Sequence, residues 1–376
     1  MRVSASPPTV ATPSALDAPP ALPGSYLVVE LTNRCSLACV HCSVSEDGHE
    51  HHAQTGYLEP SLFFDLVDDL EGVGARFGAL IPFWLGEPLL HPHFSAIWRR
   101  ALRSAARFGT FEKVEVHTNA THLTAARTAA LLNDAPTSTV LHLSLDAATR
   151  ETYHRIKGLD RFEKVDANVA HFVAEKGRTG ARGPRPVFQY IVGSNNVHEV
   201  SAFRDRWEGV CREAGVPVVA AAGHVPPGES AVVFFRQLDC PTAEEQEHEN
   251  AVFRGAMAEL GLELPSEAAR GEQVEASNLA PCSGFWKSPV VSWQGDVTVC
   301  TRDNLLENCV GSLTESRFRD LWWGGALSGR RSRVAEGDYS GLELCSTCFI
   351  PRSLNHVDLA AEDVAATAAW QAGRAS

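Results

Sequence analysis

Short apolar runs alternate with amphipathic stretches over roughly the first 236 positions of the 376-residue chain. Stretches such as Leu62–Val73 and Val165–Val173 have the spacing of helices that bury one face. The alternation predicts an α/β fold in which parallel strands are joined by crossover helices. The predicted strands are Tyr26–Leu31, Leu80–Leu85, Lys113–Thr118, Val140–Asp146, Val187–Val192, Pro217–Ala222 and Ala231–Arg236.

Two of these strands carry polar residues at every second position, so one face of each is polar. A polar face on a parallel sheet indicates a lumen that holds a ligand. We therefore expect a partial (β/α)6 barrel of the TIM type rather than a flat, doubly wound sheet. The polar faces consist of Glu115, His117 and Asn119 in the third strand and of His142, Ser144 and Asp146 in the fourth.

Three cysteines, Cys35, Cys39 and Cys42, follow the first predicted strand at the spacing C-x3-C-x2-C. Thiolates are soft ligands that select zinc, copper(I) or iron–sulfur clusters. A closed structural zinc site needs four ligands, whereas a cubane held by three leaves one iron open for a small molecule. The alternatives are a zinc knuckle or plain buried cysteines.

With His41 just before the third cysteine, this spacing resembles the signature of the radical S-adenosylmethionine (SAM) superfamily. In that family the three cysteines hold a [4Fe-4S] cluster, and SAM chelates the open iron. Gly86-Glu87-Pro88 resembles the family's Gly-Gly-Glu-Pro turn, which binds the SAM amino group, although Leu85 replaces the first glycine.

Two further motifs resemble this family in the order expected over residues 25–192. Ser144-Leu145-Asp146 resembles a Ser-x-Asp motif that contacts the SAM carboxylate and ribose, and Thr118-Asn119-Ala120 resembles Thr-Asn-Gly. Each motif alone is compatible with a turn or a capping group. The SAM-binding residues that the resemblance implies are His41, Gly86, Glu87, Asn119, Ser144 and Asp146.

A second group of cysteines lies near the C-terminus. Cys282, Gly295 and Cys300 form C-x12-G-x4-C, and Cys345 and Cys348 form C-x2-C. The pattern resembles the auxiliary-cluster domain called SPASM, in the short form called twitch. By that resemblance the four cysteines hold a second, closed [4Fe-4S] cluster that passes electrons. A four-cysteine zinc site is the alternative.

Three cysteines remain outside these groups. Cys211 belongs to the apolar face of a predicted helix and is expected in the core. Cys309 is expected to be buried near the auxiliary cluster. Cys240 follows the last predicted barrel strand, at the end where active sites gather, and is the candidate for a functional thiol.

Composition argues against some classes of function and indicates how the chain is divided into domains. The net charge of −13 argues against a nucleic-acid partner, and no apolar run is long enough for a membrane helix or a signal peptide, so we expect a cytoplasmic protein. The expected parts are a disordered tail (1–24), the barrel (25–240), a helical connector (241–280), the twitch domain (281–353) and a C-terminal tail (354–376).

Radical SAM enzymes with the short auxiliary domain include dehydrogenases and epimerases of aminoglycoside and aminocyclitol pathways. The resemblance implies oxidation of a carbinol carbon in such a substrate to a ketone, with a flavodoxin or ferredoxin as reductant and the auxiliary cluster as electron acceptor. Alternatives are an epimerase with Cys240 as hydrogen donor, a peptide maturase and a non-enzymatic scaffold. The residues expected to bind or deprotonate the hydroxyl are Glu30, Glu115, His117 and Gln189.

Overall fold

The computed structural model describes residues 18–22, 24–40, 42, 54–240, 243–264, 281–348 and 359–375. Most of the predicted N-terminal tail and His41 lie outside the described residues. None of the described helices is long and apolar enough to cross a membrane.

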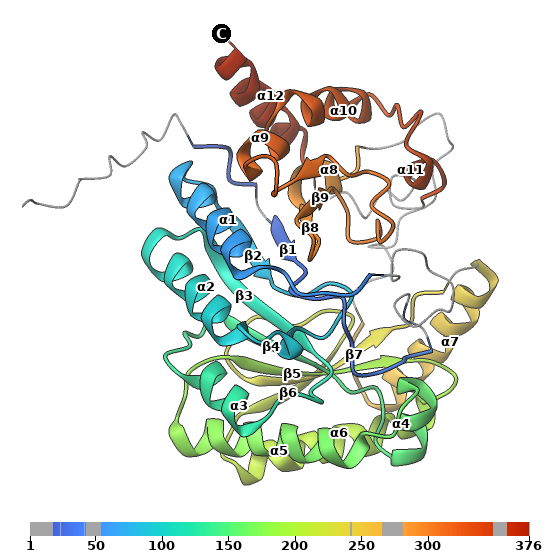
Figure 1. Cartoon of the computed structure of the whole chain (residues 1–376). Coiled ribbons are helices and arrows are strands. Elements are labelled where there is room, and N and C mark those ends of the chain that lie inside the picture. Colours follow the sequence, from blue (N-terminus) through green and yellow to red (C-terminus); the bar gives the residue numbers. More distant parts are fainter. Residues whose placement is uncertain are drawn as a thin grey trace, which may run out of the picture.

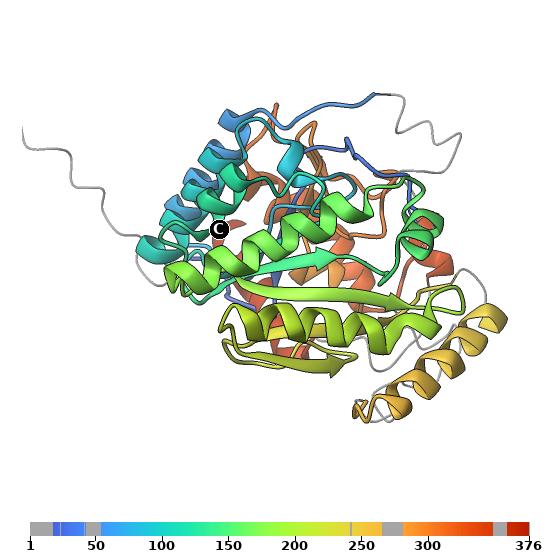
Figure 2. The ribbon, with the colours of Figure 1, turned by 90° about the horizontal axis from the view of Figure 1, so that it is seen from below.

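Seven parallel strands form the core sheet, with helices over one face (Figures 1 and 2). Their order is β1-β2-β3-β4-β5-β7-β6. The apolar faces of the strands and helices pack into one continuous core. The strands are β1 (Tyr26–Val29), β2 (Phe77–Ile81), β3 (Phe111–Thr118), β4 (Thr139–Ser144), β5 (Arg185–Val192), β6 (Val218–Ala222) and β7 (Ala231–Gln237).

Helices connect most of these strands, as the alternating pattern predicted. Lys157, at the end of α4, is followed by Gly158 in the left-handed conformation, and the same kind of glycine cap ends α2 and α5. The helices are α1 (Pro60–Gly72), the 3-10 turn η3 (Pro88–Leu90), α2 (Phe94–Phe108), α3 (Ala125–Leu132), α4 (Arg150–Lys157), α5 (Phe162–Thr179), the 3-10 turn η4 (Val197–Glu199), α6 (Val200–Glu213) and α7 (Ala243–Glu259).

Two details of the core differ from the sequence-based expectation. Strand β2 begins three residues earlier and ends at Ile81, because Pro82 and the following turn leave the sheet. Strand β7 lies between β5 and β6, so the strands do not follow one another in sequence order. The apolar run of β7 is buried throughout, which suits an inner position, whereas β6 exposes 42% of Val219 at the sheet edge.

The C-terminal part continues the same sheet beyond β1. Strand β8 (Val290–Val291) pairs in parallel with β1, and β9 (Asp296–Thr298) and β10 (Gly311–Ser312) follow antiparallel. These strands and their helices form the upper part of Figure 1. The helices are α8 (Gly284–Lys287), α9 (Phe318–Trp322), α10 (Gly325–Ala335), α11 (Glu343–Thr347) and α12 (Ala361–Ala375).

Candidate active site

The loop with the first three cysteines runs from β1 and is held on two sides. Asn33 donates its side-chain N–H to the Gln54 carbonyl at 2.8 Å and accepts the Gly56 N–H at 3.0 Å. On the other side, the Ala38 N–H donates to the Lys157 carbonyl at 3.1 Å. A Cβ at Gly158 would lie 2.0 Å from the Ala38 oxygen, so the end of α4 approaches the loop as closely as a glycine allows.

The Gly-Glu-Pro turn lies directly against the backbone of this cysteine loop. A Cβ at Gly86 would meet the Thr32 oxygen at 2.1 Å, and the Glu87 N–H donates to the Arg34 carbonyl at 2.8 Å. Only glycine fits at position 86 without moving the loop. Leu85 is apolar and packs with Trp84 in a small cluster.

The Glu87 carboxylate is buried, with 1% of the residue exposed, and collects three hydrogen bonds. It accepts the Thr118 hydroxyl at 2.7 Å and the Asn119 and Leu89 N–H groups at 2.7 and 3.0 Å. A carboxylate offers about four lone-pair directions, so about one remains for a ligand. Burial raises the pKa of Glu87 to about 7, although the three hydrogen bonds lower it in part.

Asn119 ties the end of β3 to the cysteine loop. Its side-chain N–H points at the Cys35 sulfur and at the Ser36 hydroxyl, each at 3.5 Å, and its oxygen accepts the Thr121 N–H at 3.0 Å. The next residue, Ala120, is fully buried with φ of 62°. That left-handed conformation suits the glycine of a Thr-Asn-Gly motif better than alanine.

The predicted Ser-x-Asp motif belongs to a buried ionic network. Asp146 is 1% exposed and pairs with the Lys157 ammonium at 2.5 Å, while its other oxygen accepts the Ile191 N–H at 2.7 Å. Ser144 accepts a hydrogen bond from Lys157 at 3.2 Å and donates one to Asp146 at the same distance. In the structure these side chains bind one another, and they hold a cation next to the cysteine loop.

The first cysteine site fits an iron–sulfur cluster. Burial raises the pKa of the Cys39 thiol, the charge of Lys157 lowers it, and the neighbouring Cys42 raises it again. Three thiolates in one loop therefore need a cation to compensate their charges, as a metal cluster does. Asn119 lies beside the Cys35 sulfur and is hydrogen-bonded to Ser36.

The second cysteine site is an apolar pocket assembled from separate segments. Burial and three neighbouring thiols together raise the pKa of Cys282 to about 12, and the four sulfurs share this pocket. The Arg302 N–H and the Asn308 side chain donate to cysteine sulfurs at 3.3 and 3.6 Å. Such a set fits a closed cluster or a four-cysteine zinc ion. The pocket is lined by Cys282, Gly284, Phe285, Val299, Cys300, Arg302, Tyr339, Leu344, Cys345 and Cys348.

Two contacts connect this pocket to the core. The Trp84 indole donates to the carbonyl of Thr301, next to Cys300, at 2.9 Å. Glu30, at the end of β1, accepts the Trp293 N–H at 3.1 Å, and burial raises its pKa to about 7. The structure thus places Glu30, a predicted catalytic candidate, at the junction of the core with the C-terminal part.

The polar face of β3 and β4 forms a stack of rings. Phe83 stacks on His117 with 5.3 Å between ring centroids, and His117 stacks on His142 at 4.2 Å. The Glu115 carboxylate lies 3.7 Å from His142 Nε2. Gln189 of β5 is paired in register with Ser144, so it shares this face one layer nearer the strands' C-terminal ends. His142 was not among the predicted site residues, although its alternation with leucines carried the signal.

None of the three remaining cysteines lines the auxiliary pocket. Cys211 is fully buried in α6, as its helical spacing predicted. Cys309 is half-buried and donates its S–H to the Gly311 carbonyl at 3.5 Å, while the preceding Asn308 contacts Cys345. Cys240 follows β7, and its N–H donates to the Gln246 side chain at 2.9 Å.

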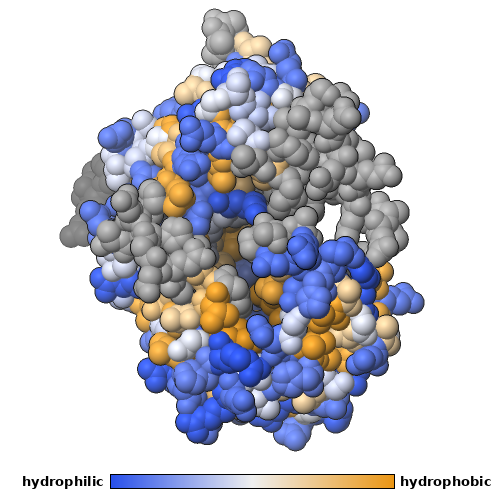
Figure 3. Space-filling view, turned by 90° about the vertical axis from the view of Figure 1, so that its right-hand side faces the viewer, coloured by the Kyte–Doolittle hydropathy of each residue, from blue (hydrophilic) through white to orange (hydrophobic). Residues whose placement is uncertain are grey.

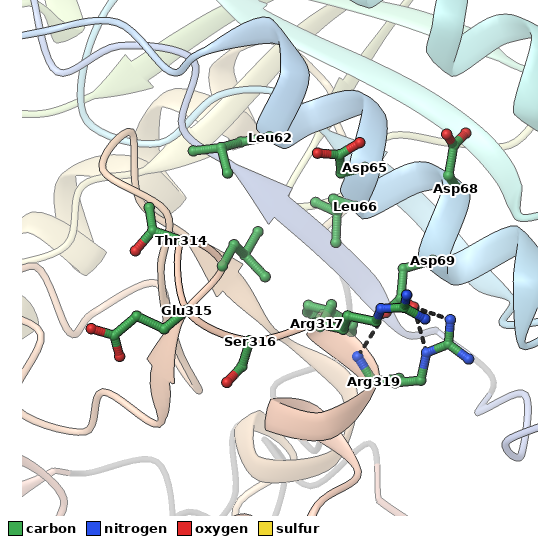
Figure 4. A pocket seen from close by; sticks show the side chains of 12 residues that line it. Leu62, Asp65, Leu66, Asp68, Asp69, Thr314, Glu315, Ser316, Arg317 and Arg319 are labelled. Atoms are coloured by element: carbon green, nitrogen blue, oxygen red, sulfur yellow. Dashed lines mark hydrogen bonds and ion pairs between the residues drawn. The ribbon is translucent and has the colours of Figure 1, made fainter.

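A larger pocket of about 520 Å³ lies elsewhere, between α1 and residues 313–319 (Figure 4). Asp69 on its wall pairs with Arg319, whereas Asp65 and Asp68 are exposed. None of the cysteines or predicted site residues lines it. The face turned to the viewer in Figure 3 is also hollowed near its centre, between the C-terminal part above and the core below.

Comparison with known proteins identifies both cysteine regions. Residues 29–182 match the model of the radical SAM superfamily, and residues 282–349 match that of an iron–sulfur cluster-binding domain, SPASM. The chain carries a radical SAM domain and a SPASM domain. A radical SAM domain uses SAM and a [4Fe-4S] cluster, and a SPASM domain holds auxiliary iron–sulfur chemistry, which agrees with the cysteines found in both places.

The proteins similar to this chain include a curated protein and several solved structures. A GTP 3′,8-cyclase of Chlorobaculum tepidum is 32% identical over 154 residues, which cover 41% of this chain and 42% of that protein. The match thus spans less than half of the curated relative. Among solved structures, anSMEcpe with bound AdoMet is 13% identical, covers 93% of this chain and 97% of its own, and has a TM-score of 0.57, which shows a shared fold.

A third protein, BtrN, was solved in complex with AdoMet and 2-DOIA. It is 15% identical and covers 87% of this chain and 94% of its own. Its TM-score is 0.45.

Proposed function

We propose that this radical SAM enzyme oxidises a carbinol carbon of a sugar or aminocyclitol to a ketone. The observation that supports the proposal is the auxiliary pocket, in which four thiols surround one apolar space. A cluster with four protein ligands has no open iron for substrate and suits electron transfer. Removal of two electrons from a substrate requires such an acceptor.

The chain's own residues would divide the task between the two sites. Cys35, Cys39 and Cys42 would hold the first cluster, and Gly86, Glu87, Asn119 and Ser144 would surround SAM. When bound, the first cluster and SAM supply a 5′-deoxyadenosyl radical that takes hydrogen from carbon, and the second cluster supplies a one-electron acceptor. The set proposed to hold that acceptor is Cys282, Cys300, Cys345 and Cys348.

Substrate binding and proton transfer are assigned to the polar face of the sheet. Side chains there would hold the substrate, take the hydroxyl proton and keep water from the reacting carbon. Glu115, His117 and Gln189 share this face; Gln189 is buried, and Glu115 and His117 are half-buried. A small electron-transfer protein of the flavodoxin or ferredoxin type would reduce the first cluster, in the cytoplasm.

An epimerase is the second candidate, and Cys240 is the observation that favours it. Partial burial raises the pKa of this thiol, and Glu249, Glu245 and Asp239 raise it further. A hydrogen-atom donor must carry its S–H bond, and the raised pKa keeps the thiol protonated. The same carboxylates would make Cys240 a poor metal ligand or nucleophile.

Turnover in deuterated water separates the two functions. Anaerobically reconstituted protein is incubated with SAM, dithionite and a panel of sugars and aminocyclitols, and products are analysed by mass spectrometry and NMR. A ketone two mass units lighter than the substrate supports oxidation. A stereoisomer with one deuterium on carbon would overturn it, and Cys240→Ala should then divert the product toward the ketone.

A further inference from the structure

Three side chains on the polar face of β3 and β4 bring metal-ligand atoms close together. They are Glu115, His117 and His142, and one donor atom of each lies within 4.8 Å of the other two. In the part of the chain that the structure describes, this is the one group of histidine, cysteine and carboxylate side chains whose donor atoms lie so close. Two imidazoles and one carboxylate are a set that binds zinc or iron(II).

The sheet itself places the three residues side by side. Glu115 and His117 are two positions apart on β3, so their side chains share one face. His117 is the register partner of His142 on β4, and register partners on adjacent strands point to the same face. Because paired strands hold all three positions, the donor atoms are supported by rigid backbone rather than by a loop.

Both histidines have a buried ring nitrogen without a hydrogen-bond partner among the described residues. These atoms are His117 Nε2 and His142 Nδ1. Buried polar atoms in native proteins are rarely left without a partner. A neutral imidazole nitrogen binds a metal ion through its lone pair, so an ion is a partner that suits this group.

The contact between Glu115 and His142 is too long for a hydrogen bond. Glu115 Oε2 lies 3.7 Å from His142 Nε2, whereas N–H···O bonds are about 2.7–3.2 Å long. Two ligands of one tetrahedral ion lie about 3.4 Å apart, because each bond is about 2.0–2.2 Å long. The observed distance is therefore closer to that between two ligands of a shared ion than to that of a hydrogen-bonded pair.

His117 completes the group after a small movement. Its ring stacks on Phe83 and on His142, with 5.3 and 4.2 Å between the ring centroids. A stacked ring can turn within its own plane, which moves its nitrogen atoms and keeps the stack. Ligands on opposite sides of one ion are at most about 4.2 Å apart, so a shift of less than about an ångström brings all three donor atoms within reach of the same ion.

We propose that Glu115, His117 and His142 bind one divalent transition-metal ion, zinc or iron(II). Three protein ligands leave at least one coordination position open for an oxygen of water or of a substrate, as in catalytic metal sites. Asn119 and Ser144, which are proposed to surround SAM, are two residues further along the same strands, or about 7 Å away. The inference goes beyond the proposed function and does not depend on the reaction that the enzyme performs.

Zinc titration of the holoenzyme tests the proposal. Protein reconstituted anaerobically with both clusters is passed over a chelating resin and titrated with Zn²⁺ in a calorimeter. The wild type should bind about one equivalent with submicromolar affinity, and Mg²⁺, which prefers oxygen ligands, should not compete. His142→Phe and Glu115→Gln should each weaken zinc binding by at least about 100-fold, more than the loss of an outer-shell contact does. His171→Phe, on the exposed side of α5, should leave it unchanged.

Element analysis before the titration detects an ion that is already tightly bound. One zinc or one iron beyond those of the clusters, absent from His142→Phe, would support the site equally. Cluster iron and SAM binding show whether each variant is folded, and His142→Asn replaces His142→Phe if it is not. A wild type with no extra ion and no zinc binding tighter than about 1 mM would overturn the inference. Equal zinc binding by wild type and variants would also overturn it, and neither result would affect the proposed oxidation.

Discussion

The two cysteine sites are built in opposite ways. The first takes three cysteines from one loop and surrounds them with buried charge, namely the Lys157–Asp146 pair and Glu87. The second takes four cysteines from three separate segments of residues 282–348 and places them in a mainly apolar pocket. The cysteines of the first site are adjacent in sequence, and ionic contacts from other elements support them. The cysteines of the second site come together only when the chain folds.

The largest effect is expected from the cysteines. We expect about eight irons per chain, four for each [4Fe-4S] cluster. Replacing Cys35, Cys39 and Cys42 with Ala should remove about half and abolish SAM cleavage, measured as release of 5′-deoxyadenosine with dithionite. Replacing Cys282 and Cys300 should remove the other half and leave SAM cleavage without ketone formation. One equivalent of zinc with about four irons would contradict the auxiliary-cluster assignment.

Lys157→Met tests the ionic support of the first site. Because it leaves the buried Asp146 without a cation, it should lower the free energy of unfolding by about 3–5 kcal/mol. Asp146→Asn in the same chain should recover part of the loss. Arg150→Met, which breaks an exposed ion pair on the same helix, should change the free energy of unfolding much less in denaturant titrations, because solvent screens that pair. Equal effects of the two variants would remove the distinction drawn between the sites.

Glu30 tests the junction between the sites through the pH dependence of the free energy of unfolding. Burial raises its pKa from 4.5 to about 7, so the folded state binds the proton more tightly than the unfolded state. The stabilisation is complete below about pH 4.5 and is lost as pH rises through about 7, by on the order of 3 kcal/mol. Glu30→Gln should flatten this dependence between pH 5 and 7.5, whereas the exposed Glu163→Gln should preserve it.

Glu87→Gln should weaken SAM binding. If the fourth lone pair of this carboxylate meets the SAM ammonium, its loss costs about 1.5–3 kcal/mol, or about 10- to 150-fold in dissociation constant. Equilibrium binding with the reconstituted protein measures the change, and the exposed Glu59→Gln serves as control. An unchanged dissociation constant of SAM would mean that Glu87 only stabilises the turn.

Trp84→Phe should have the smallest effect. It keeps a ring in the small apolar cluster but removes the hydrogen bond to Thr301. The expected cost is about 1 kcal/mol in unfolding free energy, with both sets of irons retained. Loss of the auxiliary irons in this variant would mean that the second site depends on polar contacts after all.

The sequence predicted the strands, the parallel sheet and the two cysteine groups because these depend on local pattern and spacing. The sequence did not predict that β7 lies between β5 and β6 in the sheet, because strand order depends on which strand is buried more completely. The sequence did not indicate Lys157, because its pairing with Asp146, eleven positions earlier, depends on the approach of α4 to the cysteine loop. The link of Glu30 to Trp293 spans most of the chain.

The pairing of β8 with β1 has a consequence for biosynthesis. Strand β1 is made first, but its second neighbour is not complete until residues 290 and 291 leave the ribosome. Until then β1 is an edge strand with open backbone groups, which invite pairing with another nascent chain. A chain truncated before β8 should therefore aggregate even though every strand of the core is present.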